Sequence, residues 1–293
     1  MNAYLDNDNL KEYAISYILY KNQEGFSFSS LTQFHYHMVV DDKSKGIVHA
    51  SAAIEFLMLA LDILDDLQDQ DDKEKPWSLV SLSTSMNIST GFLMLSTLVL
   101  RQSRFENELK IEALQYLDEQ VLRAVEGQHK DLQCSCATEE EFVSMMKEKS
   151  GSLMACATLV GATLQCTTQH EIIRDYSENF GVAAQLANDI EGLLRLDTKN
   201  DLLHKQWTLP IMLLAKESDR EADWIRAYYA GKVDKEFMVQ REEELFQWIY
   251  HSPVVSYVKV LKRLYQRKAL ERMLDLQVSQ AWKDGMQEYI EHI

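Results

Sequence analysis

The most chemically distinctive segment of this 293-residue chain is an acidic run, in which six of the eleven residues from Asp62 to Asp72 are aspartates. Asp62, Asp65 and Asp69 are spaced three and four residues apart, so they share one face of a helix. Like charges at this spacing oppose helix formation, and burial makes an unpaired carboxylate costly. No Lys or Arg occurs in the run before Lys73, so we expect a divalent cation with oxygen ligands to neutralise it.

A second polar cluster consists of Gln185, Asn188 and Asp189, again three and four residues apart. Amide and carboxylate oxygens suit Mg²⁺ or its water shell, and Mg²⁺ turns a diphosphate into a leaving group. We predict a magnesium site across a cavity, with Asp65 and Asp69 on one side and Asn188 and Asp189 on the other.

Helices must position these clusters, because chain breakers are scarce: the chain has 3 Pro and 10 Gly. This composition excludes collagen-like, disordered and hairpin-rich β architectures. Apolar residues recur at helical spacing almost throughout, which predicts an all-α protein. We expect helices near residues 9–20, 29–39, 48–69, 79–101, 106–131, 139–147, 150–167, 170–196, 208–216, 219–230, 233–249 and 254–290, the last interrupted.

Two of these helices have the pattern of central helices. Residues 51–64 are apolar nearly all the way round, which is typical of a helix buried on every side. Residues 180–194 are mostly apolar and carry the second polar cluster. Since there is no repeat or Gly/Ser/Pro linker, we predict one domain over residues 1–293, a helical bundle whose core opens into a cavity with a polar mouth.

Charge and the N-terminal sequence limit the partners and the location. The net charge is −16, which repels phosphate backbones, so no nucleic-acid partner is expected. The N-terminus lacks the pattern of a secretory signal, and the longest apolar stretches, 56–64 and 92–100, fall short of the ~20 residues that span a bilayer. We expect a cytoplasmic protein, and peripheral membrane contact through an apolar patch stays open.

Six motifs, in order, resemble those of the trans-isoprenyl diphosphate synthases between about residues 50 and 210. Asp65 to Asp69 matches the first aspartate-rich motif, D-D-x-x-D. The others are Gly127-Gln128 with Asp131-Leu132, Lys149-Ser150 with Leu153, Phe180-Gly181 with Ala183 and Gln185, Asn188-Asp189 to Gly192 in the second aspartate-rich motif, and Asp201-Leu202 with Thr208-Leu209-Pro210.

The resemblance implies an isoprenoid-synthase-like helical bundle around a central cavity. It implies that the catalytic residues are Asp65, Asp66, Asp69, Gln185 and Asp189, with Gln185 orienting metal-bound water or steadying an allylic cation. It also implies that substrate is bound by Lys149, Lys205 and Gln128 at the diphosphate and by Phe56, Ala60 and Leu61 along the prenyl chain.

Several departures from the family pattern concern the second diphosphate. Members that elongate with isopentenyl diphosphate carry Arg-Arg-Gly after the first motif, and here residues 72–77 contain no arginine. Residues 39–50, compared with the family's G-G-K-R-x-R-P segment, also lack arginine. Arginine grips phosphate bidentately and lysine does not replace it. In addition, Asn188 and Gly192 replace aspartates, and Lys205 and Gln206 stand where Gly-Lys is expected.

An enzyme that ionises an allylic diphosphate but binds no second diphosphate substrate needs a different molecule to accept the prenyl group. This pattern is similar to that of the ComQ-type pheromone-modifying enzymes of bacterial quorum sensing. The resemblance implies transfer of a geranyl or farnesyl group to the tryptophan of a small peptide precursor, with Mg²⁺ as cofactor. The small side chain of Ala60 favours farnesyl over geranyl as the transferred group. The resemblance also implies a homodimer, since family members are usually homodimers.

Three other readings stay open. A terpene cyclase would need Ser and Glu in the second motif, where Gly192 and Leu196 stand. A short-chain prenyl diphosphate synthase would need the missing arginines. An inactive regulatory subunit is expected to lose the first motif, which is complete here.

Overall fold

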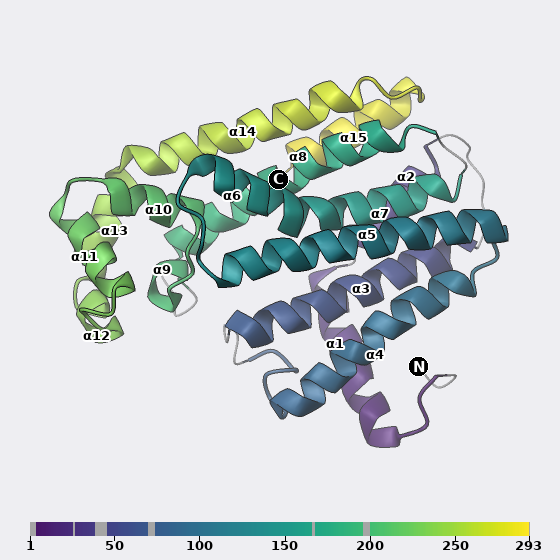
Figure 1. Cartoon of the computed structure of the whole chain (residues 1–293), viewed down its shortest axis with the longest axis horizontal. Helices are drawn as coiled ribbons and strands as arrows, with labels where there is room; N and C mark the ends of the chain where they lie inside the picture. Colours follow the sequence, from purple (N-terminus) through teal and green to yellow (C-terminus); the bar gives the residue numbers. More distant parts are fainter. Residues whose placement is uncertain are drawn as a thin grey trace. The chain divides into compact units, whose positions relative to one another are not determined.

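The computed structural model describes residues 4–25, 27–38, 46–69, 74–165, 168–195 and 200–292. Every regular element in these ranges is helical, which confirms the all-α prediction (Figure 1). The elements are α1 Asp8–Glu24, α2 Ser27–Tyr36, α3 Gly46–Asp69, α4 Leu82–Arg101, α5 Asn107–Leu132, α6 Glu139–Met146, the π-helical turn η1 Lys147–Gly151, α7 Ser152–Thr163, α8 His170–Leu194, α9 Asp201–His204, α10 Leu209–Lys216, α11 Arg220–Tyr229, α12 Lys235–Val239, α13 Glu242–His251, α14 Pro253–Met273 and α15 Gln280–Glu291.

The predicted helices match these elements closely, with three differences. The helix expected over 233–249 is two helices, α12 and α13, whereas the interruption expected within 254–290 is confirmed by the break between α14 and α15. The short helix α9, capped by Asn200, was not predicted. The turn η1 precedes α7, where a regular α-helix was expected from residue 150. Such short elements lie below the length at which apolar periodicity is readable.

The chain divides into two compact units. The first comprises Met1–Val121, Leu153–Arg174 and Gln277–Trp282, and the second comprises Leu122–Ser152, Asp175–Leu276 and Lys283–Ile293. The single domain expected over residues 1–293 therefore stays a prediction, and each unit is described by itself.

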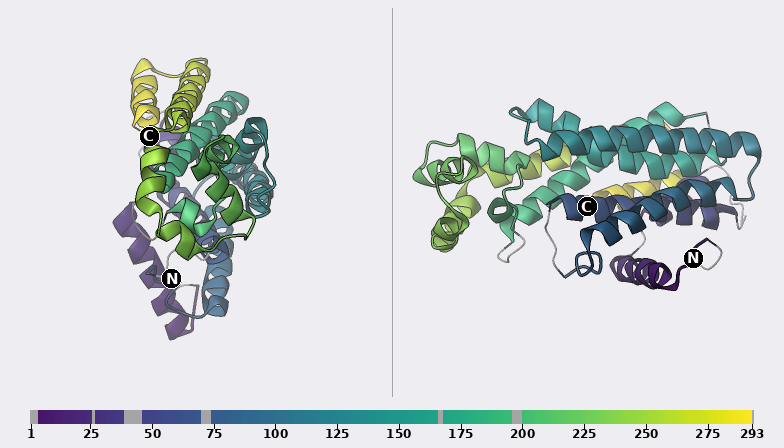
Figure 2. Two further views of the ribbon diagram at one scale, coloured as in Figure 1. Left: turned by 90° about the vertical axis from the view of Figure 1, so that its left-hand side faces the viewer. Right: turned by 60° about the horizontal axis from the view of Figure 1, so that its bottom comes forward.

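In the first unit, α3 is the central helix, with twelve buried residues along its length. It runs beside α4 (Figures 1 and 2), where Phe56 and Phe92 stack with ring centroids 5.7 Å apart. The Ser89 hydroxyl donates to the Ala60 carbonyl at 2.8 Å. On α1, the Tyr17 hydroxyl hydrogen-bonds Ser85 of α4 at 3.1 Å.

The apolar length of α3 also bears on the membrane question. Among the described residues it is the one helix long and apolar enough to cross a bilayer, and 61% of its apolar window is buried inside the protein. The apolar helix is therefore longer than the apolar stretch 56–64 that was identified in the sequence. Burial of this kind is what a core helix shows.

In the second unit, the C-terminal half of α8 packs with α10, α11, α13 and α14 around a common apolar core. Figure 1 shows α11, α12 and α13 gathered beside α10. The Tyr228 hydroxyl donates to the Leu203 carbonyl at 2.8 Å, and that of Tyr229 donates to the Gln206 carbonyl at 2.7 Å. These bonds fix the segment that follows α9.

Candidate active site

The first aspartate-rich motif forms the last turns of α3. Asp65, Asp66 and Asp69 are half-buried there, and the last turn of the helix contains no basic residue. The C-terminal end of a helix carries a partial negative charge, so carboxylates at this end are destabilising unless cations approach them. The local structure therefore favours cation binding at this end of α3.

Two of the aspartates in the run already have cationic partners from the protein. Lys75 donates to both oxygens of Asp66 at 2.9 and 2.8 Å, and Lys21 of α1 donates to Asp62 at 2.7 Å. The expectation that only a divalent cation neutralises the run is therefore wrong for Asp62 and Asp66. Spacing alone could not assign these pairs, because Lys75 follows Asp66 by nine residues and Lys21 precedes Asp62 by forty-one.

A buried tryptophan completes the contacts of Asp66. The Trp77 indole N–H donates to Asp66 at 2.8 Å, and the side chain is only 1% exposed. Tyr17 and Tyr20 meet its ring edge-on, and the Ser85 hydroxyl donates to its carbonyl at 2.7 Å. Burial raises the pKa of Asp66 although Lys75 and Trp77 both donate to it. Asp66 is thus held by the segment that lacks the family's arginines.

The second motif lies on α8, where one carboxylate is deeply buried. Asp189 is 4% exposed, Gln185 is half-buried, and Asn188 is exposed. The Gln185 amide donates to Asp189 at 2.8 Å and accepts from the Ser150 hydroxyl at 2.5 Å. These two hydrogen bonds fix the orientation of the Gln185 amide, because the amide oxygen accepts from Ser150 and the amide nitrogen donates to Asp189.

Burial raises the pKa of Asp189 to about 7. The hydrogen bond from Gln185 and the charge of Lys149 lower this pKa, whereas Asp201 and Asp131 raise it. The cations of the protein therefore do not fully offset the burial of this carboxylate. A hard cation bound to its oxygens would do so.

Lys149 is presented by the π-helical turn η1. Its ammonium group pairs with Asp131 at 2.6 Å, close to the end of α5. A Cβ on Gly127 would overlap the backbone nitrogen of Lys149, so glycine is what lets α5 lie against this turn. Gln128 follows on α5 and is half-buried. π-helical turns of this kind often occur at functional sites.

Gly192 has a structural reason to differ from the family's aspartate. A Cβ at this position would overlap the carboxylate of Asp201. A longer side chain could therefore enter only if Asp201 moved. The carboxylate of Asp201 lies where the side chain of residue 192 would begin.

Lys205 also replaces a family glycine and keeps the backbone conformation that glycine favours. Its φ is 60° in the left-handed region, where it caps α9. A non-glycine residue there costs roughly 1–2 kcal/mol. Its ammonium group lies 4.5 Å from the centroid of the Tyr228 ring and the residue is exposed. Contact with a diphosphate stays a prediction for this residue.

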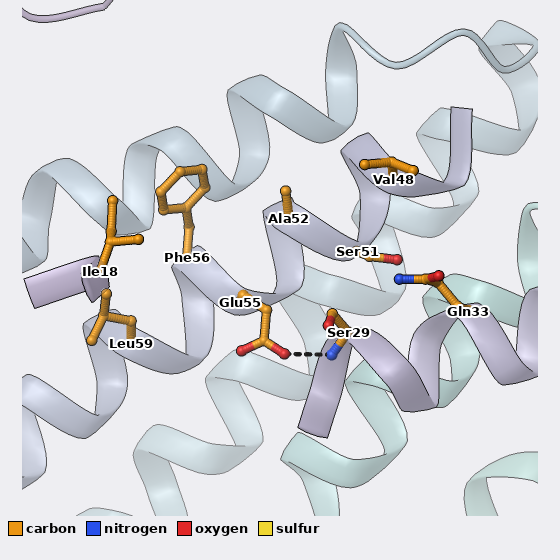
Figure 3. Close-up of a pocket in the computed structure, with 9 residues that line it drawn as sticks. All are labelled: Ile18, Ser29, Gln33, Val48, Ser51, Ala52, Glu55, Phe56 and Leu59. Carbon is orange, nitrogen blue, oxygen red and sulfur yellow. Dashed lines mark hydrogen bonds between the residues drawn. The ribbon is translucent and has the colours of Figure 1, made fainter. Parts of the chain in front are cut away.

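The residues expected along the prenyl chain differ in their surroundings. Ala60 is fully buried, whereas Phe56 and Leu61 are half-buried. Phe56 lines a cavity between α1, α2 and α3 (Figure 3). A role in limiting prenyl length stays a prediction for all three.

The donor atoms fit magnesium in kind. Asp65 and Asp69 offer carboxylates in the first unit, and Asp189 and Asn188 offer carboxylate and amide oxygens in the second. Within the described ranges, no three His, Cys, Asp or Glu side chains lie close enough together to form a metal site. The two motifs belong to different units, so their meeting at one ion stays a prediction.

The polyprenyl synthetase family model matches residues 26–249 of the chain. Tryptophan prenyltransferase ComQ of Bacillus spizizenii is 30% identical over 94% of this chain and 96% of its own length. In fold, the chain is similar to a geranylgeranyl pyrophosphate synthetase from the archaeon Geoglobus acetivorans, with a TM-score of 0.81, 19% identity and coverage of 99% and 90% of the two chains. A geranylgeranyl pyrophosphate synthase from Corynebacterium glutamicum, solved with isoprenyl diphosphate and magnesium, gives a TM-score of 0.82 at 16% identity over 96% and 89%.

The fold, the aspartate-rich motifs and these likenesses define an all-α prenyltransferase. The chain belongs to the polyprenyl synthetase family.

Some contacts of the site were not predicted from the sequence. Lys75 and Trp77 were identified only as part of a stretch without arginine, and Ser150 only as part of a motif. An ion pair of Lys75 with the acidic run could have been expected from the sequence, since this lysine follows the run by only a few residues. Nothing in the spacing assigned the Trp77 indole to Asp66.

Proposed function

We propose that this protein catalyses the Mg²⁺-dependent transfer of a geranyl or farnesyl group from its allylic diphosphate to the tryptophan of a small peptide precursor, a pheromone-type signal. The observation that carries this proposal is the ion pair of Lys75 with Asp66. The donor motif is complete, but Lys75, in the stretch where elongating members carry arginines, is bound to the motif itself.

The relatives support the choice of acceptor. The Bacillus spizizenii relative is a tryptophan prenyltransferase by name and aligns over nearly the whole of both chains. The Corynebacterium glutamicum structure contains isoprenyl diphosphate and magnesium, which supports the donor class and the cofactor.

In this proposal Asp65, Asp69, Asn188 and Asp189 hold Mg²⁺. The bound ion would neutralise the diphosphate and stabilise its charge as it leaves. Lys149, Lys205 and Gln128 bind the diphosphate oxygens. Ser150 orients Gln185, which in turn holds Asp189 in place.

The reaction breaks the bond between the allylic carbon and the diphosphate oxygen, and the electron pair leaves with the diphosphate. A carbon of the electron-rich indole then forms the new carbon–carbon bond, and one proton is lost from the product. Phe56, Ala60 and Leu61 form an apolar wall that keeps water from the allylic cation. The small Ala60 favours farnesyl over geranyl.

We also propose that the protein acts in the cytoplasm as a homodimer. Leu82, Met86 and Met94 are exposed on one face of α4, and Ile111 is exposed on α5. Exposed apolar side chains in such a stripe are typical of an interface. Sedimentation of the wild type and Met86→Glu tests this: a concentration-dependent dimer that Met86→Glu dissociates is expected. Monomers that bind lipid vesicles through this stripe would instead indicate peripheral membrane contact.

The decisive experiment incubates the protein and Mg²⁺ with geranyl or farnesyl diphosphate and a short tryptophan-containing peptide. The peptide is expected to gain the mass of one prenyl group, and EDTA is expected to prevent this. Elongation with isopentenyl diphosphate would identify a short-chain synthase, and cyclic hydrocarbons formed without peptide would identify a terpene cyclase. Either result in place of prenylated peptide would contradict the proposal.

A further inference from the structure

The helix α14 concentrates positive charge in an otherwise acidic protein. Its 21 residues include six Lys or Arg residues and one acidic residue, Glu271, whereas the whole chain has a net charge of −16. The helix is continuous over Pro253–Met273 and belongs to the second unit (Figure 1). Neither aspartate-rich motif lies on α14, so the proposed reaction does not account for this charge.

The exposed residues of α14 form two neighbouring stripes. Lys259, Arg263 and Arg267 are four residues apart, so they follow one line along the helix, and all three are exposed. Val260 and Leu264 form the adjacent line and are 62% and 45% exposed. Like charges at this spacing oppose helix formation, and exposed apolar side chains are unfavourable in water. A partner that is negatively charged and partly apolar would stabilise both stripes.

Two cations of this face have no counterion in the protein. Arg267 pairs with Glu271 at 2.7 Å, one turn further along the helix. Within the described ranges, Lys259 and Arg263 form no hydrogen bond or ion pair. The charges of these two residues are therefore available to a partner outside the chain.

Neighbouring elements limit the extent of this face. The Tyr257 hydroxyl donates to Glu139 at 2.5 Å, so the acidic first turn of α6 lies at the N-terminal end of α14. The Gln266 amide donates to the Ile290 carbonyl of α15 at 3.0 Å, and Gln266 lies about 120° round the helix from Val260. The basic and apolar face therefore runs over residues 259–268, about 15 Å of helix.

The combination of the two stripes distinguishes among anionic partners. A nucleic acid would satisfy the cations but leave Val260 and Leu264 in water. An acidic peptide needs a groove to order it, and the outer face of a single helix is a convex ridge. An anionic bilayer offers phosphates at its surface and an apolar layer just beneath them, which matches a helix that lies in the interface.

We infer that the face of α14 formed by Lys259, Val260, Arg263 and Leu264 docks this protein on anionic lipid bilayers. The two cations meet headgroup phosphates, and the two apolar side chains enter the layer below. This inference goes beyond the proposed function and does not depend on it. If that function holds, docking brings the enzyme to the surface where an amphiphilic prenyl diphosphate accumulates.

Co-sedimentation of the full-length protein with vesicles tests the cationic stripe. EDTA is present, so that no metal bridges acidic side chains to lipid. Binding is expected to vesicles of phosphatidylcholine and phosphatidylglycerol in equal parts, to weaken with added salt, and to be absent with phosphatidylcholine alone. Each Lys or Arg near an anionic surface strengthens binding roughly fivefold, so Lys259→Ala with Arg263→Ala should weaken it about 25-fold.

A matched variant controls for net charge. Lys232→Ala with Lys235→Ala removes two exposed cations of the same unit that lie outside α14, and should bind these vesicles within about twofold of the wild type. Circular dichroism of both double variants identifies any loss of fold. Alanine favours helix at exposed positions, so the α14 variant is expected to fold.

A second double variant tests the apolar stripe. Val260→Gln with Leu264→Gln keeps every charge, and it should weaken binding to the same vesicles at least about fivefold. Val239→Gln changes an exposed apolar residue of α12 in the same way and should have no effect. A loss confined to the α14 variants also distinguishes this face from the apolar stripe of α4.

Several results would overturn the inference. Equal binding of wild type and folded Lys259→Ala, Arg263→Ala to anionic vesicles would contradict it, as would failure of the wild type to bind them. Equal binding to phosphatidylcholine alone would show that the cations contribute nothing. If poly-glutamate binds the wild type and Val260→Gln, Leu264→Gln equally, while neither binds vesicles, the face serves an acidic protein segment instead. Peptide prenylation without vesicles is measured separately and bears only on the proposed function.

Discussion

Lys75 donates to both carboxylate oxygens of Asp66, at 2.9 and 2.8 Å, with Trp77 donating to the same carboxylate at 2.8 Å. The middle aspartate of the first motif is therefore bound by the protein, and Asp65 and Asp69 are the members of the motif assigned to the metal. The same contact occupies Lys75, one of two lysines in the stretch that lacks the arginines of elongating enzymes. One ion pair thus links the proposed choice of metal ligands to the stretch in which arginine is missing from the sequence.

This ion pair should stabilise the fold. Lys75→Ala leaves a half-buried carboxylate with one donor fewer, and we expect it to lower the free energy of unfolding by about 2 kcal/mol, measured in urea. Lys75→Arg keeps the charge and should cost less than about 1 kcal/mol. In a double-mutant cycle with Asp66→Asn, a coupling energy near zero would show that the two side chains do not stabilise one another in solution.

The aspartates assigned to the metal should be essential for transfer but not for folding. Asp65→Ala and Asp69→Ala should each lower kcat/KM at least about a hundredfold, because the leaving diphosphate loses its electrostatic stabilisation. Asp8→Ala, on the exposed first turn of α1, serves as the matched control and should keep full activity. Helical content followed by circular dichroism should not change, and activity retained by both motif variants would end the metal assignment.

Asp189 should make the stability of the magnesium-free protein depend on pH. Its pKa is raised from 3.8 to about 7 in the folded state, so the folded protein binds more protons than the unfolded chain between these values. Stability contributed by this group is therefore present at low pH and is lost as the pH rises from about 4 to about 7, by up to about 4 kcal/mol.

Asp189→Asn provides the control for this pH dependence, because the amide does not titrate. We expect urea unfolding of the variant between pH 4 and pH 7 to show a flatter profile than the wild type. Since Mg²⁺ binds the ionised carboxylate, proton release on metal binding near pH 6 should also be detectable by calorimetry in two buffers. Identical pH profiles for the two proteins would rule out a raised pKa at Asp189.

Restoring the family's aspartate at position 192 should destabilise the protein. Gly192→Asp introduces a Cβ that overlaps the Asp201 carboxylate, and a second negative charge beside it. We expect a loss of about 1–3 kcal/mol in the free energy of unfolding. The double variant Gly192→Asp, Asp201→Ala should recover much of this loss, and additive effects would contradict the steric explanation.

The helices and the order of the motifs were predictable because both depend on local sequence. Thr138 and Glu141 form a capping box at the start of α6, a motif that depends only on residues three apart in the chain, and the apolar faces of α3 and α8 follow from 3.6-residue periodicity. Breaks such as that between α12 and α13 depend on which side chains find a tertiary partner, so periodicity alone merged them.

The sequence by itself determined the all-α fold, the aspartate-rich motifs and the absence of arginine after the first motif. Only the tertiary structure decided which polar side chains meet: Lys75 with Asp66, Lys21 with Asp62 and Ser150 with Gln185. It also placed the buried Ser51 hydroxyl, which has no hydrogen-bond partner among the described residues, beside the cavity between α1, α2 and α3. The reason is physical: periodicity and composition act along the chain, whereas ion pairing and burial depend on distances across it.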